Sequence, residues 1–132
     1  MKIFLLLVLL SPSLSKKIPD EVRKTWNEIT APHLSYCLKH SNISADEAES
    51  MLESAHIPNK ERFHNYLQCI YEKSGMLQPD GNFNLNVIYS KSKPIKQEAL
   101  LKKCVEKTEN EKHLAKKSYL LCICIVDGLA ED

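Results

Sequence analysis

The chain has 132 residues, of which 43% are hydrophobic, and its 18 Lys and Arg nearly balance its 17 Asp and Glu. This length suits one compact domain, and the absence of a basic face or charged tail argues against nucleic acid or an anionic membrane as a partner. Because only three glycines are present and alternating β-branched runs are scarce, the composition predicts an all-α fold.

The N-terminus has the pattern of a secretory signal peptide. Lys2 supplies a short positive region, and the apolar run of eight residues that follows it is too short to span a bilayer. Small residues near Ser15 predict cleavage after that position. The alternative is a membrane anchor or a buried helix. We therefore expect a signal peptide over residues 1–15 and a single soluble, secreted, extracellular domain over residues 16–132.

A first helical region is predicted from Pro19 to His40. Pro32 is expected to break it, because proline lacks the amide hydrogen that a helix interior requires. Val22, Trp26 and Ile29 share one face of its first half. Trp26 is interpreted as ordinary core, with a place in a cavity wall as the alternative.

The next segment carries two overlapping motifs. Asn42-Ile43-Ser44 is an N-glycosylation sequon, but Ser44 also opens a capping box with Glu47. We interpret Ser44 as the cap of a helix that continues to about Ala55, with glycosylation of Asn42 as the alternative.

The organising element is an amphipathic helix predicted from Asn59 to Gly75. Asn59 is its expected N-cap, and Gly75 can adopt the positive φ that closes a helix. One stripe is built by apolar residues at spacings of three and four, namely Phe63, Tyr66, Leu67, Ile70 and Tyr71.

The second half of the chain alternates turns and helices. Residues 79–82, Pro-Asp-Gly-Asn, predict a turn, and residues 85–89 predict a short helix. Pro94 is expected to begin another helix, because proline fits the first helical turn. The last helix is predicted over residues 110–126 and is expected to end at Asp127-Gly128.

Five cysteines in an oxidising compartment predict up to two disulfides and one free thiol. Cys122 and Cys124 are two apart on a helix, so they point to different sides and are not expected to bond to each other. The scattered histidines form no metal-ligand pattern, and neither a Gly-rich phosphate loop nor a Gly-x-Ser-x-Gly elbow is present. We expect no metal, no cofactor and no enzymatic activity.

The cysteine spacing resembles that of the insect odorant-binding proteins, the pheromone and general odorant-binding family. Members carry six cysteines on six helices, with three residues between the second and third and eight between the fifth and sixth. The turn after the central helix is also similar. The first, third, fourth and sixth cysteines correspond to Cys37, Cys69, Cys104 and Cys122.

Counting back by the family spacing places the two missing cysteines at Asn65 and His113. Both belong to the family's second-to-fifth bridge, so the chain resembles the four-cysteine, minus-C branch. The resemblance implies that Asn65 and His113 lie close together, in a looser pair of helices. Protonation of His113 below about pH 6.5 would then weaken packing and promote ligand release.

The implied fold is a compact bundle of about six helices around an apolar cavity, stapled by two disulfides. Cys124 would be a free buried thiol, with a dimer-forming cysteine as the alternative. The disulfides implied by the family pairing are Cys37–Cys69 and Cys104–Cys122.

The implied function is that of a carrier for small hydrophobic ligands such as odorants, pheromones or similar lipophiles. It would act as a monomer or weak homodimer, with a membrane chemoreceptor as a further partner. Tyr119, Tyr89 or Ser118 could donate a hydrogen bond to the ligand. The alternative is a secreted helical interaction protein, a receptor ligand or venom component, with a filled core. The expected cavity wall, with ordinary core as the alternative at each position, comprises Met51, Leu52, Ile57, Leu67, Ile70, Met76, Phe83, Val87, Ile88, Leu101, Val105, Tyr119 and Ile123.

Overall fold

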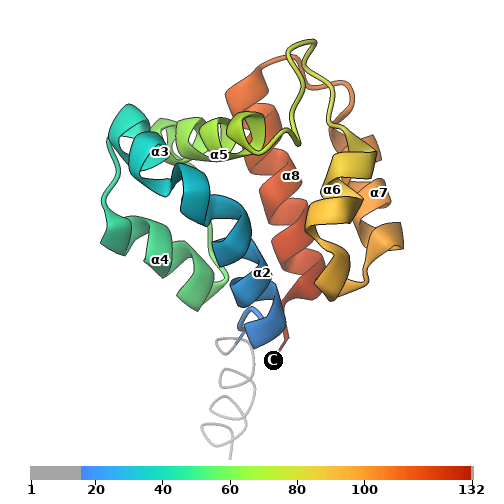
Figure 1. The fold of residues 1–132 in the computed structure, drawn as a ribbon, viewed down its shortest axis with the longest axis horizontal. Helices are drawn as coiled ribbons and strands as arrows, with labels where there is room; N and C mark the ends of the chain where they lie inside the picture. The colour runs from blue at the N-terminus through green and yellow to red at the C-terminus, as the bar shows by residue number, and fades with distance from the viewer. Residues whose placement is uncertain (1–15, 132) are drawn as a thin grey trace, which may run out of the picture.

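The computed structural model describes residues 16–131, and the predicted signal peptide lies outside this range. Within it the chain forms helices joined by short connections, with isolated bridges but no strand. In Figure 1, α5 and α8 run through the middle, with α3 and α4 on one side and α6 and α7 on the other. The all-α prediction is confirmed. The elements, with η denoting a 3₁₀-helix, are α2 (Asp20–Thr30), η2 (Ala31–His33), α3 (Leu34–Ser41), α4 (Ala45–Ser54), α5 (Glu61–Lys73), α6 (Leu85–Lys91), η3 (Lys93–Ile95), α7 (Glu98–Thr108) and α8 (Leu114–Leu129).

The first helical region is broken where Pro32 was expected to break it. The three-residue turn η2 contains the proline, and the chain re-enters a helix at Leu34. α3 ends at Ser41 and is capped by Asn42, whose left-handed backbone (φ 56°) directs its amide to the carbonyls of Leu38 and Lys39. α2, η2 and α3 therefore form one kinked unit, as predicted.

α4 begins with the predicted capping box. The Ser44 hydroxyl accepts a hydrogen bond from the Glu47 amide at 3.1 Å, and the Glu47 carboxylate accepts one from the Ser44 amide at 3.0 Å. The same carboxylate binds both terminal nitrogens of Arg62, at 3.1 and 2.9 Å. These bonds, from Arg62 first, lower the pKa of Glu47 to about 2. A surface ion pair thus links α4 to α5.

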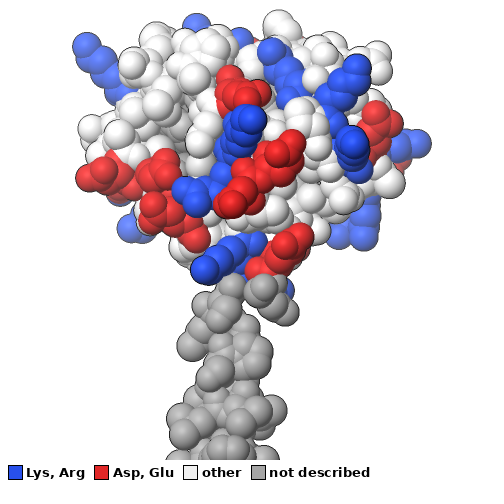
Figure 2. Space-filling view, turned by 60° about the horizontal axis from the view of Figure 1, so that its bottom comes forward, with Lys and Arg blue, Asp and Glu red and all other residues white. Residues whose placement is uncertain are grey.

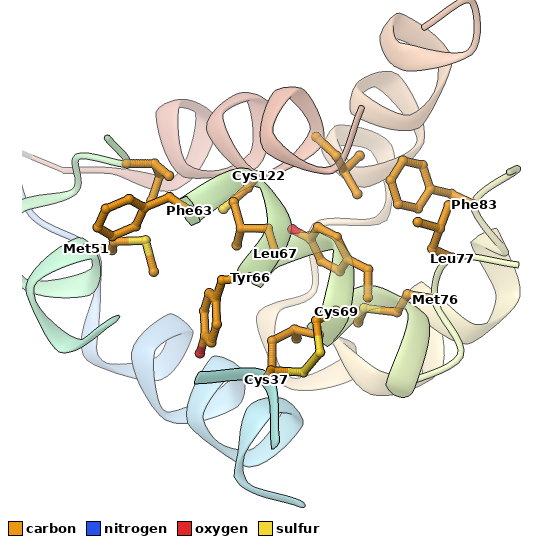
Figure 3. Close-up of a cluster of buried hydrophobic side chains, with 14 of the residues drawn as sticks. Cys37, Met51, Phe63, Tyr66, Leu67, Cys69, Met76, Leu77, Phe83 and Cys122 are labelled. Atoms are coloured by element: carbon orange, nitrogen blue, oxygen red, sulfur yellow. A yellow bond between two sulfur atoms is a disulfide. The ribbon is translucent and has the colours of Figure 1, made fainter. Parts of the chain in front are cut away.

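α5 lies at the centre of the fold, packed against α3 and α8. Its predicted stripe is confirmed, because all five residues of the stripe are buried, together with Cys69. Figure 3 shows part of this core, with the disulfide that joins Cys37 to Cys69. Gly75 follows the helix with a φ of +83°, as expected.

The predicted N-cap of α5 is wrong. The helix begins at Glu61, and Lys60 precedes it without a side-chain cap. Asn59 lies one residue too far from the helix start to cap it. Its side-chain oxygen instead accepts a hydrogen bond from Nε2 of His64 at 2.9 Å.

The predicted turn after α5 is a tight hairpin held by α8. Leu77 and Phe83 form an antiparallel bridge, and Gly81 adopts a φ of +89° at the tip. Lys117 is 4% exposed and donates a hydrogen bond to the Gly81 carbonyl at 2.6 Å. Its ammonium also lies 5.6 Å from the centre of the Phe83 ring.

The helix expected to begin at Pro94 is divided in two. Pro94 lies in the short turn η3, and α7 begins only at Glu98. Between them, Lys96 adopts a left-handed backbone with a φ of +56°. One such residue interrupts the helical hydrogen-bond pattern, so the proline opens η3 and not α7.

α8 is longer than predicted at its C-terminus and shorter at its N-terminus. It begins after His113, whose ring accepts a hydrogen bond from the Lys116 amide, and continues through Gly128 to Leu129. A Cβ at Gly128 would lie 2.6 Å from a methyl of Leu100. Glycine here ends no helix; it allows α8 to approach α7, and the buried Leu129 anchors the last turn.

The second predicted disulfide is wrong. Cys104 bonds to Cys124, with 20 residues of separation, and Cys122 is the free cysteine and is buried. Two residues on a helix differ by about 200° in direction, so only one of the pair can face Cys104 on α7. Cys124 takes that direction, which turns Cys122 toward α5. The bridge Cys37–Cys69 is as predicted.

The face in Figure 2 carries Lys and Arg side chains intermixed with Asp and Glu, without a patch of one sign. Among the described residues, no helix is both long and apolar enough to cross a membrane.

Candidate ligand-binding cavity

An apolar cavity lies between α2 and the opposite wall formed by α5 and α8. Its volume is about 80 Å³, several times the roughly 10–15 Å³ that one water molecule requires on such a measure. Every α-helix of the described chain except α3 contributes to it. The lining consists of Ile18, Val22, Thr25, Trp26, Ile29, Met51, Leu52, Ile57, Leu67, Tyr71, Met76, Ile88, Ser92, Ile95, Leu101, Leu121, Cys122, Ile125, Val126 and Leu129.

The structure brings part of the predicted wall together around this cavity. The predicted residues that line it are Met51, Leu52, Ile57, Leu67, Met76, Ile88 and Leu101. Ile70 and Phe83 are instead buried in the core outside the cavity, and the remaining ones are half-buried and pack against that core. These remaining residues are Val87, Val105, Tyr119 and Ile123.

The wall that sequence reasoning missed is α2. Val22, Trp26 and Ile29 all line the cavity, and Trp26 also packs against the core, as the sequence predicted. Their common face was visible in the sequence. Periodicity shows that a face is buried but not what it is buried against, so it could not distinguish cavity wall from core.

Two further contributions come from the chain ends of the domain. Ile18 and Leu129 are buried and line the cavity. Next to them, Lys17 and Glu131 form an antiparallel bridge, with backbone hydrogen bonds of 2.7 and 2.8 Å. The two ends of the described chain are therefore joined beside the cavity.

The polar groups of the cavity are few and uncharged. Tyr71 is 3% exposed and Cys122 is 7% exposed. Burial raises the pKa of Tyr71 well above its usual value and that of Cys122 to about 12. Both groups therefore stay protonated at neutral pH.

The three predicted hydrogen-bond donors do not line the cavity. The Ser118 hydroxyl donates to the Leu114 carbonyl at 2.9 Å inside α8. Tyr119 stacks on His64, with ring centres 4.3 Å apart, and Tyr89 is half-buried against the core. Tyr71 does line the cavity, and the sequence analysis interpreted it as part of the central stripe.

A second titratable cluster lies where α5 meets the start of α8. His64 stacks on Tyr119, and its pKa is lowered by burial first, then by the nearby His113 and Lys116. The folded protein therefore favours the neutral imidazole. Protonation would place a charge beside two basic groups, with Glu61 as the opposing influence.

We expect this cluster to make stability depend on pH. Because the folded pKa of His64 lies below its ordinary 6.5, the unfolded chain binds the proton more tightly, and stability falls as pH falls below about 6.5. Urea unfolding at pH 7.5 and pH 5 should show a smaller loss in His64→Gln than in the wild type. The exposed His56→Gln serves as control. Equal losses in wild type and His64→Gln would contradict this assignment.

Comparison with protein families gives a match over most of the described chain. The model of the PBP/GOBP family matches residues 20–127, from the start of α2 to the last turns of α8. The chain belongs to the PBP/GOBP family. No curated protein and no solved structure matches it in the same comparisons.

The observed disulfide pairing shifts the position that the family spacing implies for a fifth cysteine. Cys124, and not Cys122, bonds to Cys104, so by the resemblance Cys124 would correspond to the sixth family cysteine. Counting back by the family spacing then gives Ala115 as the fifth position. Ala115 is buried on α8, which packs along α5, whereas His113 is exposed.

Proposed function

We propose that this PBP/GOBP protein is a secreted carrier that binds small hydrophobic ligands in the cavity between α2, α5 and α8. The observation that carries the proposal is a cavity lined mostly by apolar side chains from six helices, in a chain of a family of binding proteins. An apolar ligand would bind by removing its own surface and the cavity surface from water, at about 25 cal/mol per Å².

The cavity walls suit ligands of varied shape. Met51 and Met76 line it, and methionine side chains are flexible and polarisable, so they adapt to different outlines. Val22 and Trp26 on α2 are half-buried, and they give the wall a side that faces solvent. A ligand could enter by displacement of these side chains.

Secretion is part of the proposal. Cleavage after Ser15 would leave the Lys17–Glu131 bridge and all described helices intact. Two disulfides suit an oxidising compartment. The protein would act as a monomer or weak homodimer that delivers its ligand, with a membrane chemoreceptor as recipient. A receptor ligand with a filled core is disfavoured by the cavity.

The test is a fluorescence titration of the protein of residues 16–132 with an apolar reporter dye, followed by displacement with volatile alcohols and esters. We expect saturable uptake at one site per chain and full displacement. The same protein unfolded in urea is the control. A folded protein with both disulfides that takes up no dye would reject the carrier function and favour a protein receptor as the partner.

We also propose that the chain belongs to the four-cysteine, minus-C branch, with Asn65 and Ala115 in place of the lost bridge. We expect the variant Asn65→Cys, Ala115→Cys to form a third disulfide that stabilises the fold, since closing a loop of about fifty residues contributes roughly 4 kcal/mol. The matched variant Asn65→Cys, His113→Cys should form it poorly. Free-thiol titration and thermal melting measure both effects, and a preference for position 113 would reverse the assignment.

A further inference from the structure

The turn between α3 and α4 carries a motif that the proposed carrier function does not use. Asn42-Ile43-Ser44 has the acceptor pattern for N-linked glycosylation, and it is the only Asn-x-Ser/Thr motif in the sequence. The chain would meet the modifying enzyme only on the secretory route, so this inference rests on the secretion proposed above.

The side chain of Asn42 is available for modification. Asn42 is exposed, whereas its neighbours Ser41 and Ile43 are 5% and 6% exposed, so the turn presents the asparagine to solvent. Only its backbone serves the fold, since the amide caps α3 and the carbonyl accepts a hydrogen bond from Arg62 at 3.3 Å. Within the described chain, no hydrogen bond engages the side-chain amide. A sugar on Nδ2 would therefore break no hydrogen bond of the fold.

The capping role of Ser44 does not compete with glycosylation. The Ser44 hydroxyl accepts a hydrogen bond from the Glu47 amide at 3.1 Å, but this bond requires α4 to be formed. Arg62, which binds the Glu47 carboxylate, and Cys69, which ties α5 to α3, both lie downstream of the motif. The motif is therefore synthesised before the contacts that fix it can form, and its serine is then free for recognition.

The position of the turn separates it from the ligand cavity. Neither α3 nor its connection to α4 contributes a lining residue to that cavity. Figure 1 places this connection at the outer edge of the molecule, on the opposite side from α6 and α7. A glycan here would add bulk and solubility to the surface and leave the cavity accessible.

We propose that Asn42 is an N-glycosylation site and that the secreted protein carries one N-linked glycan on the turn between α3 and α4. The Asn42 Nδ2 forms a bond to the anomeric carbon of an oligosaccharide, and the bond from that carbon to a lipid-linked pyrophosphate breaks. The pyrophosphate leaves with the bonding electrons and the amide proton passes to a base, so the transfer requires no oxidant or reductant.

The test expresses the full chain in a mammalian cell line and compares the intact mass of the secreted protein before and after digestion with peptide N-glycosidase F. We expect a loss of mass on digestion, with Asn42 converted to aspartate in the peptide that contains it. A protein secreted at its unmodified mass would overturn the site and leave the carrier function intact. A chain retained in the cytosol without a glycan would overturn the site and secretion together.

Two substitutions at Ser44 separate glycosylation from capping. Ser44→Asp keeps an N-cap acceptor but destroys the motif, whereas Ser44→Thr keeps both. We expect Ser44→Asp to be secreted without a glycan and Ser44→Thr to carry one, with equal affinity for the reporter dye in both variants and the wild type. A glycan that persists in Ser44→Asp would overturn the assignment to Asn42. Dye binding only in Ser44→Asp would overturn the placement of the glycan away from the cavity.

Discussion

Removal of the Cys104–Cys124 bridge is expected to lower the free energy of unfolding by about 3–4 kcal/mol, the loop-entropy estimate for a bridge of this span. The reference protein is Cys122→Ala, which retains both disulfides and has no free thiol. The test protein adds Cys104→Ala and Cys124→Ala. Because alanine introduces no buried polar group, the difference in urea unfolding between the two proteins reports the bridge.

The pairing itself is tested in the wild type. Alkylation of the unfolded, unreduced protein, followed by digestion and tandem mass spectrometry, should place the label on Cys122. Burial of Cys122 against Tyr71 on α5 predicts that the thiol is unreactive until the protein unfolds. A label on Cys124 would show that the bridge is Cys104–Cys122 and that α8 is rotated relative to its position here.

Val22→Trp is expected to weaken ligand binding at least tenfold, which corresponds to about 1.4 kcal/mol. Val22 lines the cavity from α2, and the larger indole would occupy space that the ligand requires. Because Val22 is half-buried, part of the added volume can turn toward solvent. We therefore expect the thermal stability to change little.

The control for Val22→Trp introduces the same side chain outside the cavity. Lys24 lies on the same helix and is exposed, so Lys24→Trp should bind the dye and its competitors as the wild type does. Equal weakening in both variants would mean that tryptophan on α2 acts through the helix or the surface. Wild-type affinity in Val22→Trp would show that the ligand does not occupy this part of the cavity.

The sequence predicts where the helices of this fold lie better than which residues each helix packs against. The stripe on α5, the break at Pro32 and the capping box at Ser44 depend on residues close together in the sequence, and all three are present. The split at Lys96 was missed because a left-handed lysine has no sequence signal. The end of α8 was missed because Gly128 does not end the helix. It lies within α8, where a glycine is needed to let Leu100 on α7 approach.

The disulfide error has a similar cause. Cys122 and Cys124 both lie on α8, and which of them faces Cys104 depends on how far α8 is rotated about its axis. That rotation depends on how α8 packs against α5 and α7, and this packing cannot be predicted from the local sequence pattern. The same rotation turns Cys122 toward Tyr71 in the cavity.

The candidate cavity was only partly predictable for a related reason. Apolar residues on α4, α5 and α7 were recognised as possible walls, such as Met51, Leu67 and Leu101. Whether a buried face meets another side chain or a void depends on how completely the helices fill the space between them. The contribution of α2 follows from the placement of this helix opposite α5 and α8.

The most direct test of the carrier cavity is a nuclear magnetic resonance measurement of contacts between bound octan-1-ol and the methyl groups of the protein. The cavity predicts intermolecular nuclear Overhauser effects to Leu67, Ile88 and Leu121, which line it from α5, α6 and α8, and their loss in Val22→Trp. Contacts confined to exposed residues, with none to these three, would show that the ligand binds on the surface and that the interior is not a binding site.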